Sequence, residues 1–136
     1  MTLTFHLKII GALLLLLASA HLFFPQRFGW KEDFAKVSLL NRQIFYVHCF
    51  FIILILAMIG VLTLFYTSLL LRRDELTKII LAALVLFWAA RLFIQLFIYD
   101  RQLWRGHRFN TAMHILFTGM WSYYVAVFAT ALVAQF

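Results

Sequence analysis

Three histidines and one glutamine each lie six residues from an arginine at the end of an apolar segment. The pairs are His21 with Arg27, His48 with Arg42, Gln95 with Arg101, and His114 with Arg108. Six residues of helix correspond to a depth of about 9 Å, so one layer could hold all four side chains. Helical bundles build metal and cofactor sites from such layers. Three neutral imidazoles suit zinc or copper, and two can ligate haem iron.

We therefore expect His21, His48 and His114 to bind a metal ion or haem for membrane redox chemistry. No HxxxH, HExxH or CxxC spacing accompanies them, and Cys49 is the single cysteine. The alternative is that each histidine hydrogen-bonds a neighbouring helix or extends to the membrane surface. Whether the chain is an enzyme stays open.

A second polar group is centred on Arg91. Arg91, Gln95 and Tyr99 are spaced four apart, so on a helix they share one face. Arg91 lies ten residues from Arg101, which places it about 15 Å inward. A mid-helix arginine at that depth costs about 2.5 to 3.5 kcal/mol even on the lenient insertion scale. Arg91 therefore needs a partner.

No acidic residue lies within an apolar segment to serve as that partner. The remaining candidates are backbone carbonyls, Gln95, Tyr123 or Tyr124, a water-filled cavity, or a bound ligand with an acidic or carbonyl head. A quinone, fatty acid or other lipid would enter laterally, with Trp88 and Trp121 packing against it. The structural alternative is an arginine that bonds carbonyls across helices and holds the bundle together.

Other polar residues lie nearer the predicted membrane surface. We expect four of them to form a polar entrance to the site: Asn41, Asp100, His107 and Asn110. Arg101, Arg105 and Arg108 are predicted to bind anionic lipid headgroups. The net charge of +7 is better explained by this interface than by nucleic acid.

The elements that must position these residues are apolar helices. Of the 136 residues, 65% are hydrophobic and 12% are charged, which excludes a water-soluble surface. Four continuously apolar segments lie near residues 5–24, 43–71, 78–99 and 109–136, and each has at least the roughly 20 residues that a bilayer requires. The sequence thus predicts an all-α, polytopic integral membrane four-helix bundle with short loops, forming one domain over residues 1–136.

Proline and charge patterns predict the connections and the orientation. Pro25 should end the first helix, and an interfacial helix, with Asp33 as a cap, should precede the second. Lys8, the run 9–17 and the small residues 18–20 also fit a cleavable signal peptide, but the apolar run continues to Phe24, which favours a retained helix. The excess of arginine and lysine in the two larger connections places them, and the site, on the cytoplasmic side.

Three functions remain open after this reading. The first is metal or haem chemistry, and the second is binding or transport of a lipid-like or quinone ligand. The third is a non-catalytic accessory subunit of a larger membrane complex or a homo-oligomer. The four short-looped segments are typical of small bacterial membrane proteins, so we expect a bacterial inner membrane.

Overall fold

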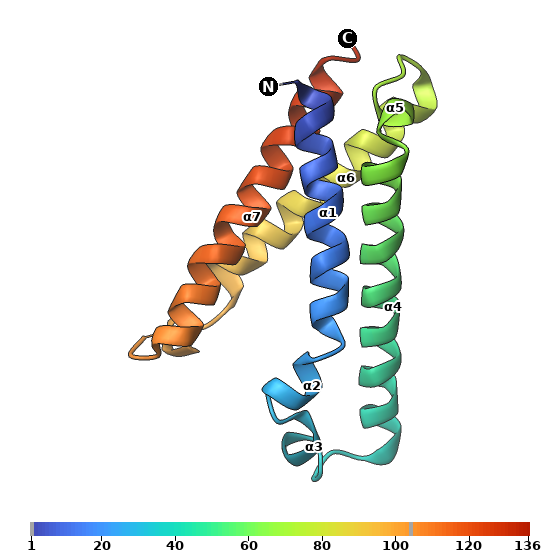
Figure 1. The fold of residues 1–136 in the computed structure, drawn as a ribbon. Coiled ribbons are helices and arrows are strands. Elements are labelled where there is room, and N and C mark those ends of the chain that lie inside the picture. The colour runs from blue at the N-terminus through green and yellow to red at the C-terminus, as the bar shows by residue number, and fades with distance from the viewer. Residues whose placement is uncertain (1, 104) are drawn as a thin grey trace. The chain divides into compact units, whose positions relative to one another are not determined.

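Every regular element in the part of the chain that the structure describes is helical (Figure 1). The structure is a computed structural model and describes residues 2–103 and 105–136. Four helices in it are long and apolar enough to cross a membrane, at Leu3–His21, Leu39–Phe65, Glu75–Ile98 and Arg108–Val133. The all-helical prediction is therefore confirmed. The second helix differs most from the predicted segment, since it starts before residue 43 and ends at Phe65, well before residue 71.

The chain divides into two compact units, one of Phe5–Thr67 and one formed mainly by Ser68–Phe136. The single domain expected from the sequence stays a prediction, and each unit is described by itself.

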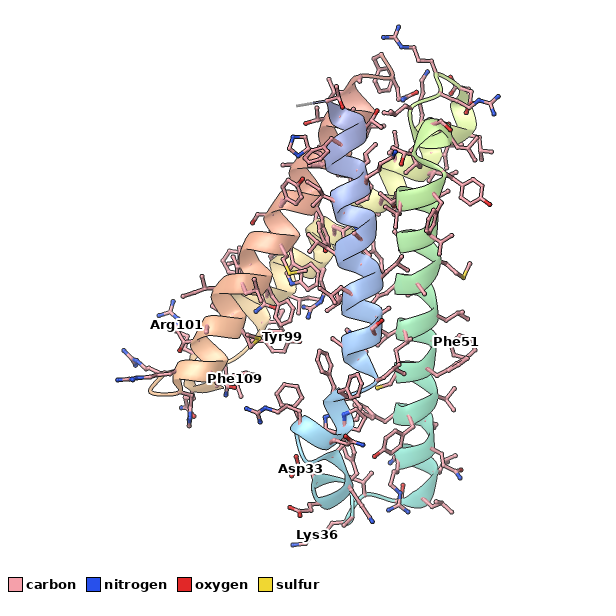
Figure 2. All side chains as sticks on the ribbon, in the orientation of Figure 1. Asp33, Lys36, Phe51, Tyr99, Arg101 and Phe109 are labelled. Atoms are coloured by element: carbon pink, nitrogen blue, oxygen red, sulfur yellow. The ribbon has the colours of Figure 1, made fainter. Side chains whose placement is uncertain are left out.

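In the unit of residues 5–67, α1 (Leu3–His21) packs closely against α4 (Leu39–Phe65) at two glycines. A Cβ atom added to Gly11 would lie 2.5 Å from the backbone nitrogen of Leu64. One added to Gly60 would lie 3.0 Å from the Leu15 side chain and 3.2 Å from the carbonyl oxygen of Gly11. Glycine at both positions therefore permits this approach. Away from the contact, α4 carries large apolar side chains such as Phe51, which projects away from α1 (Figure 2).

Two short helices, α2 (Phe24–Arg27) and α3 (Trp30–Asp33), connect α1 to α4. Pro25 lies in the first turn of α2, where the missing N–H costs nothing, and α1 has already ended at His21. Gly29, with φ of 65°, separates the two short helices. The prediction that Pro25 ends the first helix is thus wrong, because the helix ends four residues earlier, at His21.

Ring contacts join α3 to the first turns of α4. The Phe45 ring lies 4.9 Å from the Trp30 ring and 4.6 Å from the Phe34 ring, centroid to centroid. The cap of α4 is Ser38, whose hydroxyl accepts a hydrogen bond from the backbone nitrogen of Asn41 at 3.3 Å. Asp33, expected to cap a helix, is instead the last residue of α3.

The unit of residues 68–136 is mainly a hairpin of two long helices that pack along their length, α6 (Glu75–Phe93) and α7 (Arg108–Val133) (Figure 1). The short helix α5 (Thr67–Leu70) precedes it. A π-helical turn, η1 (Ile94–Ile98), extends α6, and a 3-10 turn, η2 (Arg101–Leu103), lies in the connection to α7. Large buried side chains come from both long helices: Leu81, Leu84 and Trp88 from α6, and Trp121, Tyr124 and Phe128 from α7.

The start of α6 is fixed by Asp74, whose Oδ1 accepts a hydrogen bond from the backbone nitrogen of Thr77 at 2.8 Å. This bond, together with the nearby charge of Arg72, lowers the pKa of the Asp74 carboxyl below its usual value. The Thr77 hydroxyl donates to the carbonyl oxygen of Leu69 at 3.1 Å and so ties the turn to α6. These bonds hold the start of α6 against the turn that precedes it.

Candidate functional site

Four aromatic rings form a continuous cluster between α6 and α7. The Trp88 and Trp121 rings stack with centroids 5.1 Å apart and planes 17° apart. Tyr124 meets Trp88 edge-on at 5.0 Å, and Phe117 stacks on Trp121 at 5.5 Å. Trp88, Trp121 and Tyr124 are at most 3% exposed. The spacing of 117, 121 and 124 places three of the rings on one face of α7, so the cluster follows from local helical geometry.

Arg91 lies against this cluster, one helical turn after Trp88. Its guanidinium carbon is 5.3 Å from the centroid of the Trp121 ring and 5.8 Å from that of the Tyr99 ring. A cation at such distances is attracted by the faces of aromatic rings. The ion pairs found in the described residues are Arg72 with Asp74 and Lys78 with Glu75, so the charge of Arg91 is not matched by a carboxylate there.

The cluster holds hydrogen-bond donors that lack acceptors. Within residues 2–103 and 105–136, four buried donor atoms have no hydrogen-bond partner: Trp88 Nε1, Arg91 Nη1, Trp121 Nε1 and the Tyr124 hydroxyl. The indole and guanidinium nitrogens can only donate. A buried donor left unpaired costs about 1 to 3 kcal/mol, and more when it is charged. Four donors in one contiguous group therefore favour a bound group that only accepts, such as a carboxylate or a carbonyl.

Gln95 and His114 lie next to Arg91 along the hairpin and bind each other. The Gln95 amide nitrogen donates to His114 Nδ1 at 2.9 Å, which leaves the neutral ring's proton on Nε2. Gln95 is 4% exposed and is part of the π-helical turn, a local widening that recurs at functional sites. The bond fastens that turn to α7 beside the aromatic cluster.

An open groove of about 440 Å³ runs along α6 and reaches Arg91. Six residues line it: Ala83, Leu86, Phe87, Ala90, Arg91 and Ile94. Its volume is within the range of about 300 to 1,000 Å³ typical of small-molecule sites. Arg91 is its one polar lining residue. An apolar groove with a cation in its lining suits an amphipathic molecule.

The histidines expected to form a layer occupy different units, His21 and His48 in one and His114 in the other. His21 Nδ1 bonds the Leu17 carbonyl oxygen at 2.8 Å, and His48 Nδ1 bonds that of Ile44 at 2.8 Å. Among the side chains that the structure describes, no three of His, Cys, Asp or Glu come close enough together to hold a metal ion. The metal or haem site of His21, His48 and His114 stays a prediction without support from the geometry.

Two of the four residues expected at the polar entrance form hydrogen bonds with the loop between α6 and α7. Asp100 Oδ1 accepts from the backbone nitrogen of Gln102 at 2.9 Å, and Asn110 Nδ2 donates to the Leu103 carbonyl oxygen at 2.7 Å. His107 precedes α7 without capping it through its side chain. Asn41 is exposed in the first turn of α4, in the other unit.

The three arginines expected to bind lipid headgroups are exposed at the connected end of the α6–α7 hairpin. Arg101 is on the connection itself and points away from the helices (Figure 2); the others are Arg105 and Arg108. Their placement leaves all three accessible, and headgroup binding stays a prediction.

The sequence did not single out Phe117 or the groove alanines. The spacing of Phe117 from Trp121 was a usable signal, since residues four apart meet on a helix. Ala83 and Ala90 carried none, because each has another alanine beside it, Ala82 and Ala89, and the sequence does not show which of the two faces outward.

Comparison with protein-family models, curated proteins and solved structures finds no match to this chain. Its function is therefore argued from its own residues.

Proposed function

We propose that this chain is an integral membrane protein whose α6–α7 unit binds a lipid-like ligand or a quinone through an acidic or carbonyl head. The observation that carries the proposal is the group of four buried donors without acceptors around Arg91. Binding alone, or transport of the bound molecule, is compatible with this chemistry.

The apolar surroundings make the unmatched donors energetically unfavourable. Inside a bilayer no water is present to satisfy them, so each must find a partner in protein or ligand. Arg91 already contacts two aromatic rings, but a ring face offers no lone pair to an N–H group. A ligand oxygen would supply one, with the neighbouring indole and phenol groups as further donors.

The groove gives such a ligand a way in from the side. Leu86 is 71% exposed and Phe87 45% exposed, so the groove opens on a face of α6 that is not packed on α7. In a membrane this surface faces hydrocarbon, and an apolar molecule could reach Arg91 without passing through water. This supports lateral entry.

The membrane arrangement belongs to the same proposal. We place the four apolar helices as a bundle in a bacterial inner membrane, with the basic α6–α7 connection in the cytoplasm. Arg101, Arg105 and Arg108 in and beside that connection support this orientation through the positive-inside rule.

The test is to identify molecules that co-purify with the chain in mild detergent. Organic extraction and mass spectrometry should find a stoichiometric lipid or quinone in the native chain. Arg91→Leu should lose it, and Arg105→Leu, which removes an exposed arginine from the connection, should retain it. Equal retention by both variants would overturn the proposal.

A second variant keeps the test decisive if Arg91→Leu fails to fold. Trp88→Phe preserves a stacking ring but removes one of the four unmatched donors. It should fold and bind the ligand at least about tenfold more weakly than the native chain, since a hydrogen bond to a charged group contributes about 1.5 to 3 kcal/mol. Native retention by a folded Trp88→Phe chain would show that this donor cluster does not hold the ligand.

A further inference from the structure

We infer that the ligand is a single-chain carboxylic acid, such as a long-chain fatty acid, with its carboxylate at Arg91 and its hydrocarbon chain in the groove of α6. The inference rests on the proposed function and names the ligand class for the same site.

The head group follows from the charge of Arg91. A quinone carbonyl would accept one hydrogen bond but leave the positive charge unmatched. A carboxylate matches it and accepts two parallel N–H bonds from the planar guanidinium. No acidic side chain occurs between Glu75 and Asp100 to do this instead. A carboxylate therefore satisfies both needs of this site, and a neutral carbonyl satisfies one.

The chain position follows from where Arg91 lies on α6. Arg91 adjoins Ala90 and follows Phe87 by one turn, and both of these line the groove. It also follows Trp88 by three residues and precedes Gln95 by four, and both of these are buried. Arg91 thus lies at the border between the groove and the face packed on α7. A head bound there would meet the guanidinium of Arg91, the one unmatched donor residue that lines the groove, while its chain extends along the groove.

The floor of the groove fits one extended hydrocarbon chain. Ala83 and Ala90 are seven residues apart, so they stack on one helix face with larger apolar side chains on either side. From Arg91 back to Ala83, the helix rises about 12 Å. All of the lining residues lie on this one face of the helix, so the groove is long and narrow.

Depth favours a free acid over a phospholipid. Arg91 lies seven residues before Ile98, where the helical part of this segment ends, or about 10 Å along the helix. A phosphodiester stays charged, and its glycerol carries a second chain that would have to follow it inward. A carboxylic acid can reach such a depth in its uncharged form, because an apolar medium raises the pKa of a carboxyl group.

The experiment measures binding of radiolabelled palmitate, octanoate and hexadecanol to the full chain in nanodiscs of uncharged lipid. Native chain should bind palmitate at least tenfold more tightly than hexadecanol, which has the same chain without the charge, and Arg91→Leu should lose that preference. Ala83→Phe, which fills the far end of the groove, should weaken the binding of palmitate about tenfold. It should leave the affinity for the shorter octanoate unchanged. Ala82→Phe is the matched control, since Ala82 is exposed on the same helix but does not line the groove.

The failures of the two proposals are distinguishable. Equal palmitate binding by Ala83→Phe and Ala82→Phe would overturn the groove assignment, while loss with Arg91→Leu would still support the proposed function. Arg91-dependent binding of decylubiquinone, without binding of palmitate, would overturn the carboxylate and uphold the head site. If no probe depends on Arg91, both proposals fail.

Discussion

Gln95 and His114 are joined by a 2.9 Å hydrogen bond from the amide nitrogen to Nδ1 of the imidazole. The bond links the π-helical turn after α6 to the first turns of α7, nineteen residues on in the chain. It joins two side chains one helical turn beyond Arg91, next to the proposed ligand site.

Removing this bond should loosen the hairpin. We expect Gln95→Leu, which keeps the side-chain volume, to lower the free energy of unfolding by about 1 kcal/mol, the typical net contribution of one hydrogen bond. Thermal unfolding in detergent measures the effect. Gln102→Leu, at an exposed position in η2, is the control and should change little. Equal melting temperatures for both variants would contradict a stabilising role for the bond.

The close approach of α1 and α4 should be intolerant of one methyl group. Gly11→Ala would place its Cβ 2.5 Å from the Leu64 nitrogen, and overpacking of this kind costs about 1 to 3 kcal/mol. Gly119→Ala, with nothing within 4 Å of the added Cβ, should instead stabilise α7 by roughly 0.5 to 1 kcal/mol. Thermal melts should show a lower melting temperature than the native chain for Gly11→Ala and a higher one for Gly119→Ala. A Gly11→Ala chain as stable as the native one would show that the helices separate at this point.

The cap of α6 should depend on pH. The Thr77 hydrogen bond to Asp74, with the charge of Arg72, lowers the carboxyl pKa, so its stabilisation is present above the unfolded pKa of about 3.9. It is lost as pH falls through the lower pKa of the folded state. We expect Asp74→Ala to melt below the native chain at pH 7, and the difference to shrink below about pH 4.

Asp74→Asn is the matched variant for that measurement. Asparagine still accepts a hydrogen bond at a helix N-terminus, but it does not titrate. Its melting temperature should therefore stay closer to that of the native chain at pH 7 and lose this part of the pH dependence. The same pH profile for the native chain and Asp74→Asn would assign the dependence to other groups.

The histidine layer can be tested separately by elemental analysis and a visible spectrum of the purified chain. His21 and His48 each bond a carbonyl of their own helix, so we expect His48→Ala to change neither metal content nor ligand occupancy. Loss of a stoichiometric metal, or of a visible absorption band, on His48→Ala would restore the redox hypothesis. His48→Gln separates loss of the imidazole from loss of volume.

Depth along each helix could be read from the sequence, but rotation about its axis could not. Gln95 and His114 were placed at one depth because each lies six residues from an arginine, and they do bind each other. The same arithmetic for His21 and His48 says nothing about which way their rings point. In the structure, each ring bonds back to its own helix.

Some helix ends were also hidden from pattern reading. The second apolar run continues to Leu71, yet α4 ends at Phe65. Tyr66 has a non-helical backbone conformation there, and the short helix α5 begins at Thr67. Hydropathy does not detect this interruption, because the sequence stays largely apolar across it. The groove could not be predicted either, because it forms only where particular alanines of α6 face outward, and the sequence does not give the rotation of the helix.

The exposure of Leu86 and Phe87 on the outer side of α6 has a kinetic consequence for the proposed site. A ligand that enters there exchanges with the surrounding lipid and never equilibrates directly with water. Its occupancy is then set by its mole fraction in the bilayer, and dilution of the vesicles in buffer will not release it. Dilution with excess empty lipid will, at a rate set by lateral escape from α6.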